Sequence, residues 1–101
     1  MLLHTVNKSP FEKDSLDTCL RLAKQGSTIL LIEDAVYAAM QGTAIESKIA
    51  ETIKRYSVYA LRSDLKARGL EEDRLLNGIK VVDYDGFVDL VAEHDTVQSW
   101  F

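Results

Sequence analysis

The chain has 101 residues, of which 47% are hydrophobic and 28% charged, and its net charge at pH 7 is -4. This length suits one domain with a modest core and is too short for two, so we expect a single domain over residues 1–101. The acidic balance argues against direct binding of nucleic acid, which depends on clustered Lys and Arg. Because no apolar run approaches the ~20 residues that cross a bilayer and no signal-peptide pattern opens the chain, we expect a cytoplasmic protein that binds no membrane.

Strand and helix patterns alternate through the first half. "LLHTV" (residues 2–6) predicts a strand, and Asp14 or Ser15 is placed to cap a helix that ends at Gly26. "STILLIE" (residues 27–33) holds a continuous apolar run, typical of a strand covered on both faces. Asp34 then predicts an N-cap for a helix over "AVYAAMQ" (residues 35–41).

The second half continues the alternation. An apolar stripe predicts a helix over residues 45–56, and "SVYAL" (57–61) predicts a strand. Ser63 is expected to cap a short helix, "IKVVDY" (79–84) to form a strand, and "FVDLVAEH" (87–94) to form a helix. Strands that alternate with helices predict right-handed crossovers. The expected fold is therefore a three-layer α/β/α, Rossmann-like domain with a small, mostly parallel sheet of four strands.

Metal and cofactor sites are not indicated. The single cysteine cannot form an internal disulfide, and Cys19, His4 and His94 lack the spacing of a zinc site. The glycine-rich phosphate-binding motifs GxGxxG and GxxxxGK[ST] are absent. We therefore expect no metal and no cofactor.

Cys19 is the one strong nucleophile and allows two interpretations. A thiolate can accept sulfane sulfur and pass the outer atom on, which makes Cys19 a possible persulfide site. However, Cys19 shares a helical stripe with Leu16, Leu20 and Ala23, and free cysteines are often buried as small hydrophobes. On the residue pattern alone, packing is favoured over reactivity.

The remaining candidates have simple structural interpretations. His4 is expected to be a satisfied core or loop-end histidine, and His94 a cation at a helix C-terminus. Asp83 is expected to bond within a turn. The aromatic pair that ends the chain, Trp100 and Phe101, either folds back onto the domain or anchors an interface with another subunit.

Five segments together resemble the DsrH/TusB family of sulfur-relay subunits. They are "LHTVNKSPF", "LLIEDAVYAA", "YALRSDLKARGL", "VVDYDGFVDLV" and "HDTVQSW", in order and over nearly the whole chain. The resemblance implies a DsrEFH-like fold and a subunit of a cytoplasmic heterohexamer with DsrE/TusD-like and DsrF/TusC-like sister chains. It also implies a DsrC/TusE-like sulfur carrier as a partner, with the principal reactive cysteine on the DsrE/TusD-type subunit.

The resemblance leaves three hypotheses open. A cysteine at the place of Cys19 is similar to DsrH-like members from sulfur oxidisers, which favours a persulfide-handling subunit in intracellular sulfur oxidation. The alternatives are a TusB-like subunit in 2-thiolation of the tRNA wobble uridine, and a purely structural subunit. In each case the chain is at most a persulfide carrier within a sulfurtransferase complex, and we expect that it can self-associate when it is alone.

Overall fold

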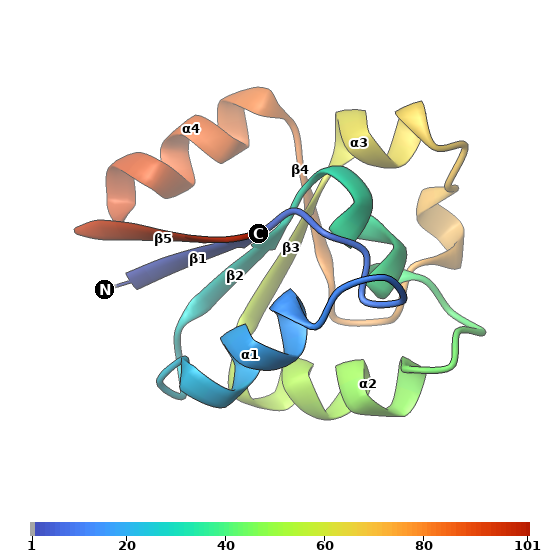
Figure 1. Ribbon diagram of the computed structural model, residues 1–101. Coiled ribbons are helices and arrows are strands. Elements are labelled where there is room, and N and C mark those ends of the chain that lie inside the picture. The colour runs from blue at the N-terminus through green and yellow to red at the C-terminus, as the bar shows by residue number, and fades with distance from the viewer. Residues whose placement is uncertain (1) are drawn as a thin grey trace.

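The computed structural model describes residues 2–101 and contains five strands, four α-helices and two short 3-10 helices within them (Figure 1). The strands are β1 (Leu2–Val6), β2 (Thr28–Leu31), β3 (Ser57–Leu61), β4 (Lys80–Val82) and β5 (Thr96–Trp100). The α-helices are α1 (Ser15–Leu22), α2 (Glu46–Arg55), α3 (Arg62–Ala67) and α4 (Tyr84–Glu93), and the 3-10 helices are η1 (Glu33–Ala39) and η2 (Glu72–Arg74). No helix in residues 2–101 is long and apolar enough to span a membrane.

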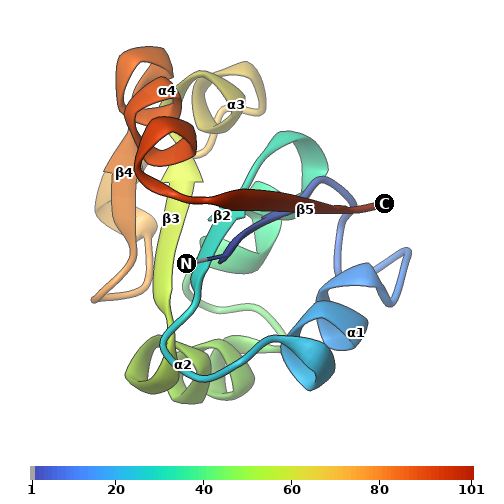
Figure 2. The ribbon, with the colours of Figure 1, turned by 90° about the vertical axis from the view of Figure 1, so that its left-hand side faces the viewer.

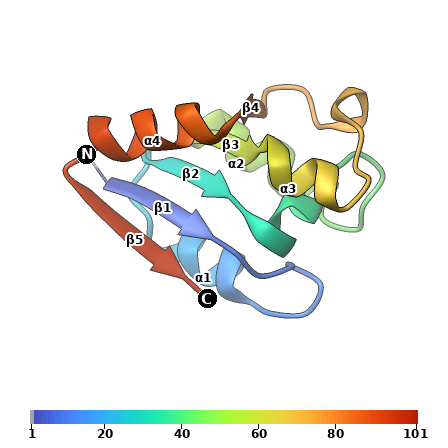
Figure 3. The ribbon, with the colours of Figure 1, turned by 90° about the horizontal axis from the view of Figure 1, so that it is seen from above.

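The strands form one parallel sheet in the order β4-β3-β2-β1-β5. β2 lies at its centre, and all four of its residues are buried, as the continuous apolar run predicted. β4 and β5 are the two edges. Because every strand runs the same way, the carboxyl ends of all five meet at one end of the sheet (Figure 3).

The predicted α/β class and parallel sheet are confirmed, but the predicted number of strands, four, is wrong. The tail "DTVQSWF" supplies β5, which pairs with β1 along its whole length. Its first four residues are exposed, so no buried face imposes an apolar alternation on them. Pairing with β1, about ninety positions earlier in the chain, defines this strand.

Helices cover both faces of the sheet and make three layers (Figure 2). On one face, α1 and α2 close the main core, in which Leu16 and Ile49 pack with Ile29 and Leu31 of β2. On the other face, α4 places Leu90 against Leu3 and Leu30. Figure 3 shows α4 beyond β2, on the side of the sheet toward β4, so that this helix does not cover β1 or β5.

Several helix ends differ from the sequence-based prediction. α1 ends at Leu22, and Gly26 lies in the following turn with a φ of 89°, a left-handed conformation that favours glycine. Asp34 and Ser63 lie inside η1 and α3, whose N-caps are Ile32 and Leu61. In place of an α-helix over residues 35–41, the chain forms the 3-10 helix η1, which ends at Ala39. η1 and α3 start directly after β2 and β3, so an apolar residue at the strand end takes the N-cap position.

Candidate functional site

Cys19 lies in the main core. It is the fifth residue of α1, its exposed fraction is 0%, and it belongs to the same buried cluster as Leu16, Ile29 and Leu31. The inward direction of the helical stripe is therefore as the sequence indicated. The structure shows no route from solvent to the sulfur atom in this conformation.

Burial also controls the protonation of Cys19. Loss of hydration disfavours the thiolate and raises the pKa of Cys19 to about 12. At neutral pH the group is a thiol, which is a weak nucleophile compared with a thiolate. The N-terminus of α1 does not offset this effect, because Cys19 lies beyond its first turn, where Asp17 adds a negative charge. In this conformation Cys19 has the properties of a packing residue.

The two C-terminal aromatic residues behave differently from each other. Trp100 is partly buried against the main core and donates a hydrogen bond from Nε1 to Nδ1 of His4 at 3.0 Å. Phe101 is 81% exposed. Trp100 therefore folds back onto β1, whereas Phe101 is free to contact another molecule.

His4 is a buried histidine whose tautomer is defined by its partner. Its exposed fraction is 2%, and because an indole nitrogen can only donate, Nδ1 of His4 must accept. In the neutral ring the proton is then on Nε2, which has no hydrogen-bond partner among residues 2–101. Burial lowers the pKa of His4, which keeps the ring neutral. This arrangement joins the two ends of the chain.

His94 and Asp83 hold α4 in place. Asp83 is the N-cap of α4, and its carboxylate accepts a hydrogen bond from the amide of Gly86 at 2.8 Å, which confirms a bond within this turn. At the other end, Nδ1 of His94 lies 2.6 Å from the carbonyl of Leu90, and Nε2 lies 3.1 Å from Oγ1 of Thr28. His94 thus connects α4 to β2.

The carboxyl ends of β2 and β3, where parallel sheets often bind ligands, are occupied by ionic contacts. Arg68 donates to Asp34 at 2.9 Å and lies 3.7 Å from Asp64, which accepts the amide of Glu33 at 2.7 Å. Each of these charges has a partner within the chain. Among residues 2–101, no group of three or more His, Cys, Asp or Glu side chains could hold a metal ion.

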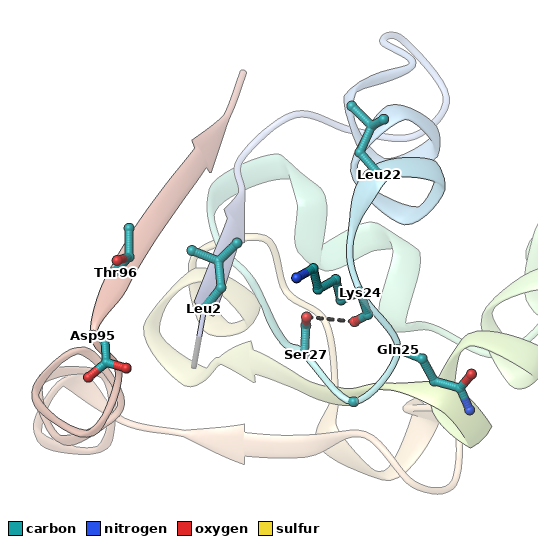
Figure 4. A pocket seen from close by; sticks show the side chains of 8 residues that line it. Leu2, Leu22, Lys24, Gln25, Ser27, Asp95 and Thr96 are labelled. Atoms are coloured by element: carbon teal, nitrogen blue, oxygen red, sulfur yellow. Dashed lines mark hydrogen bonds between the residues drawn. The ribbon is translucent and has the colours of Figure 1, made fainter.

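A surface depression of about 610 Å³ lies at the opposite end of the sheet (Figure 4). Its wall includes Leu2 at the start of β1, Thr96 at the start of β5 and the loop that carries Lys24 and Ser27. Ser27 donates to the carbonyl of Lys24 at 2.6 Å, which fixes this loop. None of the described residues that line the depression is a cysteine or a histidine.

The protein is a parallel α/β domain in which the only cysteine, Cys19, is buried and the edge strand β5 is exposed. The model of a family described as "DsrH like protein" matches residues 8–97. Relatives named "Protein TusB" are 36% identical over 99 residues in Pectobacterium parmentieri and 41% identical over 100 residues in Shigella flexneri, and each alignment covers 98% of this chain and 100% of the relative. The chain belongs to the DsrH-like family, the family of sulfur-relay subunits that the sequence resembles.

Solved structures show the same architecture. The ychN protein from E. coli superposes with a TM-score of 0.84 at 20% identity, over 97% of each chain. Protein Tm0979 from Thermotoga maritima superposes with a TM-score of 0.63 at 26% identity, over 94% of this chain and 95% of its own. The same fold therefore occurs in proteins that share only 20% and 26% of their residues with this chain.

Proposed function

We propose that this chain is a TusB-type subunit of a sulfur relay that serves 2-thiolation of the tRNA wobble uridine. The observation that carries the proposal is the end-to-end likeness to relatives named Protein TusB, at 36% to 41% identity over 98% of this chain. The sulfur-oxidation hypothesis, which the sequence favoured, depended on a reactive Cys19. The enclosed, protonated thiol gives that hypothesis less support than the relatives give to thiolation.

The proposed role of the chain is assembly, with the covalent sulfur chemistry on other subunits. A persulfide forms when a thiolate attacks sulfane sulfur, so the thiol must be both ionised and reachable. Cys19 meets neither condition, since its exposed fraction is 0% and its pKa is raised to about 12. His4 is not a base for it, because Nδ1 of His4 already accepts from Trp100 and Nε2 carries the proton.

The proposed partners follow from the family and from charge. DsrE/TusD-like and DsrF/TusC-like chains would form the complex, and a TusE-like carrier would take the sulfur from it. A net charge of -4 supports contact with proteins rather than with tRNA, because binding to phosphates depends on an excess of clustered Lys and Arg. The tRNA would then be bound by a later component of the relay.

The direct test is to delete the gene for this chain from its own organism and to measure thiolated wobble uridine in digested tRNA by mass spectrometry. We expect the thiolated nucleoside to disappear and to return when the wild-type gene is restored. Restoring a Cys19→Ala gene should return it equally well, because the thiol takes no part. Unchanged thiolation after deletion would contradict the proposal.

The same strains separate the sulfur-oxidation alternative. If deletion leaves tRNA thiolation intact but abolishes oxidation of stored or supplied reduced sulfur, the chain belongs to the oxidation branch. If the Cys19→Ala gene also fails to restore oxidation while the variant protein accumulates normally, Cys19 is a sulfur site. We expect neither result.

A further inference from the structure

β5 is an edge strand without the features that normally block edge-to-edge pairing. Its five residues, Thr96 to Trp100, include no charge and no proline, and four of the five are exposed. Natural proteins protect such edges with lysines, prolines, bulges or covering loops. The opposite edge, β4, is only three residues long and carries Lys80. The sheet is therefore open for extension on the β5 side.

The direction of the backbone groups in β5 follows from its pairing with β1. The carbonyl of Trp100 accepts the amide of Asn7 at 3.4 Å, so Trp100 faces β1. Because successive residues of a strand point their N–H and C=O groups to alternate sides, Thr96 and Gln98 also face β1. Val97 and Ser99 then direct theirs to the open edge. The carbonyl of Ser99 receives one long contact of 3.3 Å from the side chain of Gln98.

We propose that β5 pairs antiparallel with β5 of a second copy of this chain, about a two-fold axis that passes beside Gln98. In this register Val97 lies opposite Ser99 of the second copy, and the two residues exchange both backbone hydrogen bonds. By symmetry, Ser99 also pairs with Val97 of the second copy, so the interface gains four backbone hydrogen bonds. All the outward backbone groups of the strand are then satisfied, and the two sheets join into one.

Side chains support a second copy as the occupant rather than an unrelated strand. Gln98 meets itself across the axis, and its amide can both donate and accept, whereas a charged residue there would face a like charge. Val97 is 40% exposed and Phe101 is 81% exposed. If the alternation of the strand continues by one residue, Val97 and Phe101 lie on the same face of the sheet. Val97 of one copy is then diagonally opposite Phe101 of the other, a separation that an aromatic ring can span.

This inference does not depend on sulfur chemistry, and it is tested on the purified chain alone. Sedimentation velocity of the wild-type protein should show a dimer whose fraction rises with protein concentration. Gln98→Lys places two positive charges at the axis and should return the protein to a monomer. Ala50→Lys adds the same charge at an exposed residue of α2, a helix that packs against β3, and should leave the dimer intact. A wild-type monomer throughout, or an unaffected dimer in Gln98→Lys, overturns the proposal.

A cross-link tests the register itself. Gln98→Cys should form an intermolecular disulfide on mild oxidation, because directly opposite residues of an antiparallel pair have the Cα separation that a disulfide requires. Cys19 is buried and does not compete. Ala50→Cys, at an exposed residue of α2, is the matched control and should remain largely uncross-linked. A dimer that forms while Gln98→Cys and Ala50→Cys cross-link equally slowly would place the interface elsewhere and contradict the proposal.

Discussion

The centre of the sheet and its β5 edge differ in what they expose. All four residues of β2 are buried, and Cys19 packs with two of them, whereas four of the five residues of β5 are exposed. The region that holds the thiol has no access to a partner. The β5 region, which can reach a partner, holds no thiol. This separation supports our proposal that the chain contributes surface rather than chemistry to a relay.

The largest expected difference between the two regions is in stability. Leu31→Ala removes a side chain that is 1% exposed and should lower the free energy of unfolding by about 2–5 kcal/mol. Val97→Ala at the edge should change it by about 0.5 kcal/mol. Urea denaturation at one low protein concentration measures both. Equal losses would mean that β5 is as tightly packed as β2.

A smaller loss of stability is expected from breaking the hydrogen bond between Trp100 of β5 and the buried His4 of β1. Trp100→Phe removes the donor to His4 and leaves Nδ1 of a buried ring without a partner, which should cost about 1–3 kcal/mol. Phe101→Ala is the matched change of an exposed aromatic residue, and we expect a loss within about 0.5 kcal/mol. The same denaturation curves report both variants. A costly Phe101→Ala combined with a neutral Trp100→Phe would reverse our assignment of the two residues.

The smallest expected effect is the pH dependence of the unfolding free energy that arises from His4, the acceptor of the Trp100 hydrogen bond. Burial lowers the pKa of His4 in the folded chain relative to the unfolded chain. The unfolded state therefore binds more protons in acid, and the stabilisation present above the unfolded pKa of about 6.5 is lost as pH falls through the folded value. His4→Asn keeps an acceptor near Nδ1 and cannot become a cation. The unfolding free energy of the wild type should therefore fall more than that of His4→Asn between pH 7.5 and pH 5, with both pH values chosen around about 6.5.

A steeper fall in the variant, or equal falls, would show that folding does not lower the pKa of His4. Tryptophan fluorescence adds a local measurement, because protonated His4 presents an N–H to the N–H of Trp100 and breaks their bond. We expect the emission of Trp100 to change with pH in the wild-type chain and to stay constant in His4→Asn.

The sequence predicted the centre of the molecule better than its edge. A buried parallel strand requires a continuous apolar run, so residues 27–33 identified β2 directly. The amphipathic stripe of α2 was equally informative. β5 was missed because its first four residues are exposed, and backbone pairing alone places it. The predicted caps at Asp34 and Ser63 failed because their helices begin at the preceding strand ends.

The candidate site shows the same contrast. The spacing of Leu16, Cys19 and Leu20 already turned the thiol toward the core, so its burial could be anticipated from helix geometry. The bond from Trp100 to His4 could not, because it joins residues 96 positions apart through the pairing of β5 with β1. No local pattern at either residue signals such a contact. Only the register of the sheet brings the two together.

The most direct test of the central claim is the mass of the folded chain after incubation with a persulfide donor, alone and co-purified with its sister subunits. We predict no gain of a sulfur atom on this chain in either state, and a gain at Cys19 once urea unfolds it. Cys19→Ala, which should gain nothing in any condition, is the control. A sulfur adduct on the folded wild-type chain that Cys19→Ala lacks would contradict the account and make this subunit a carrier.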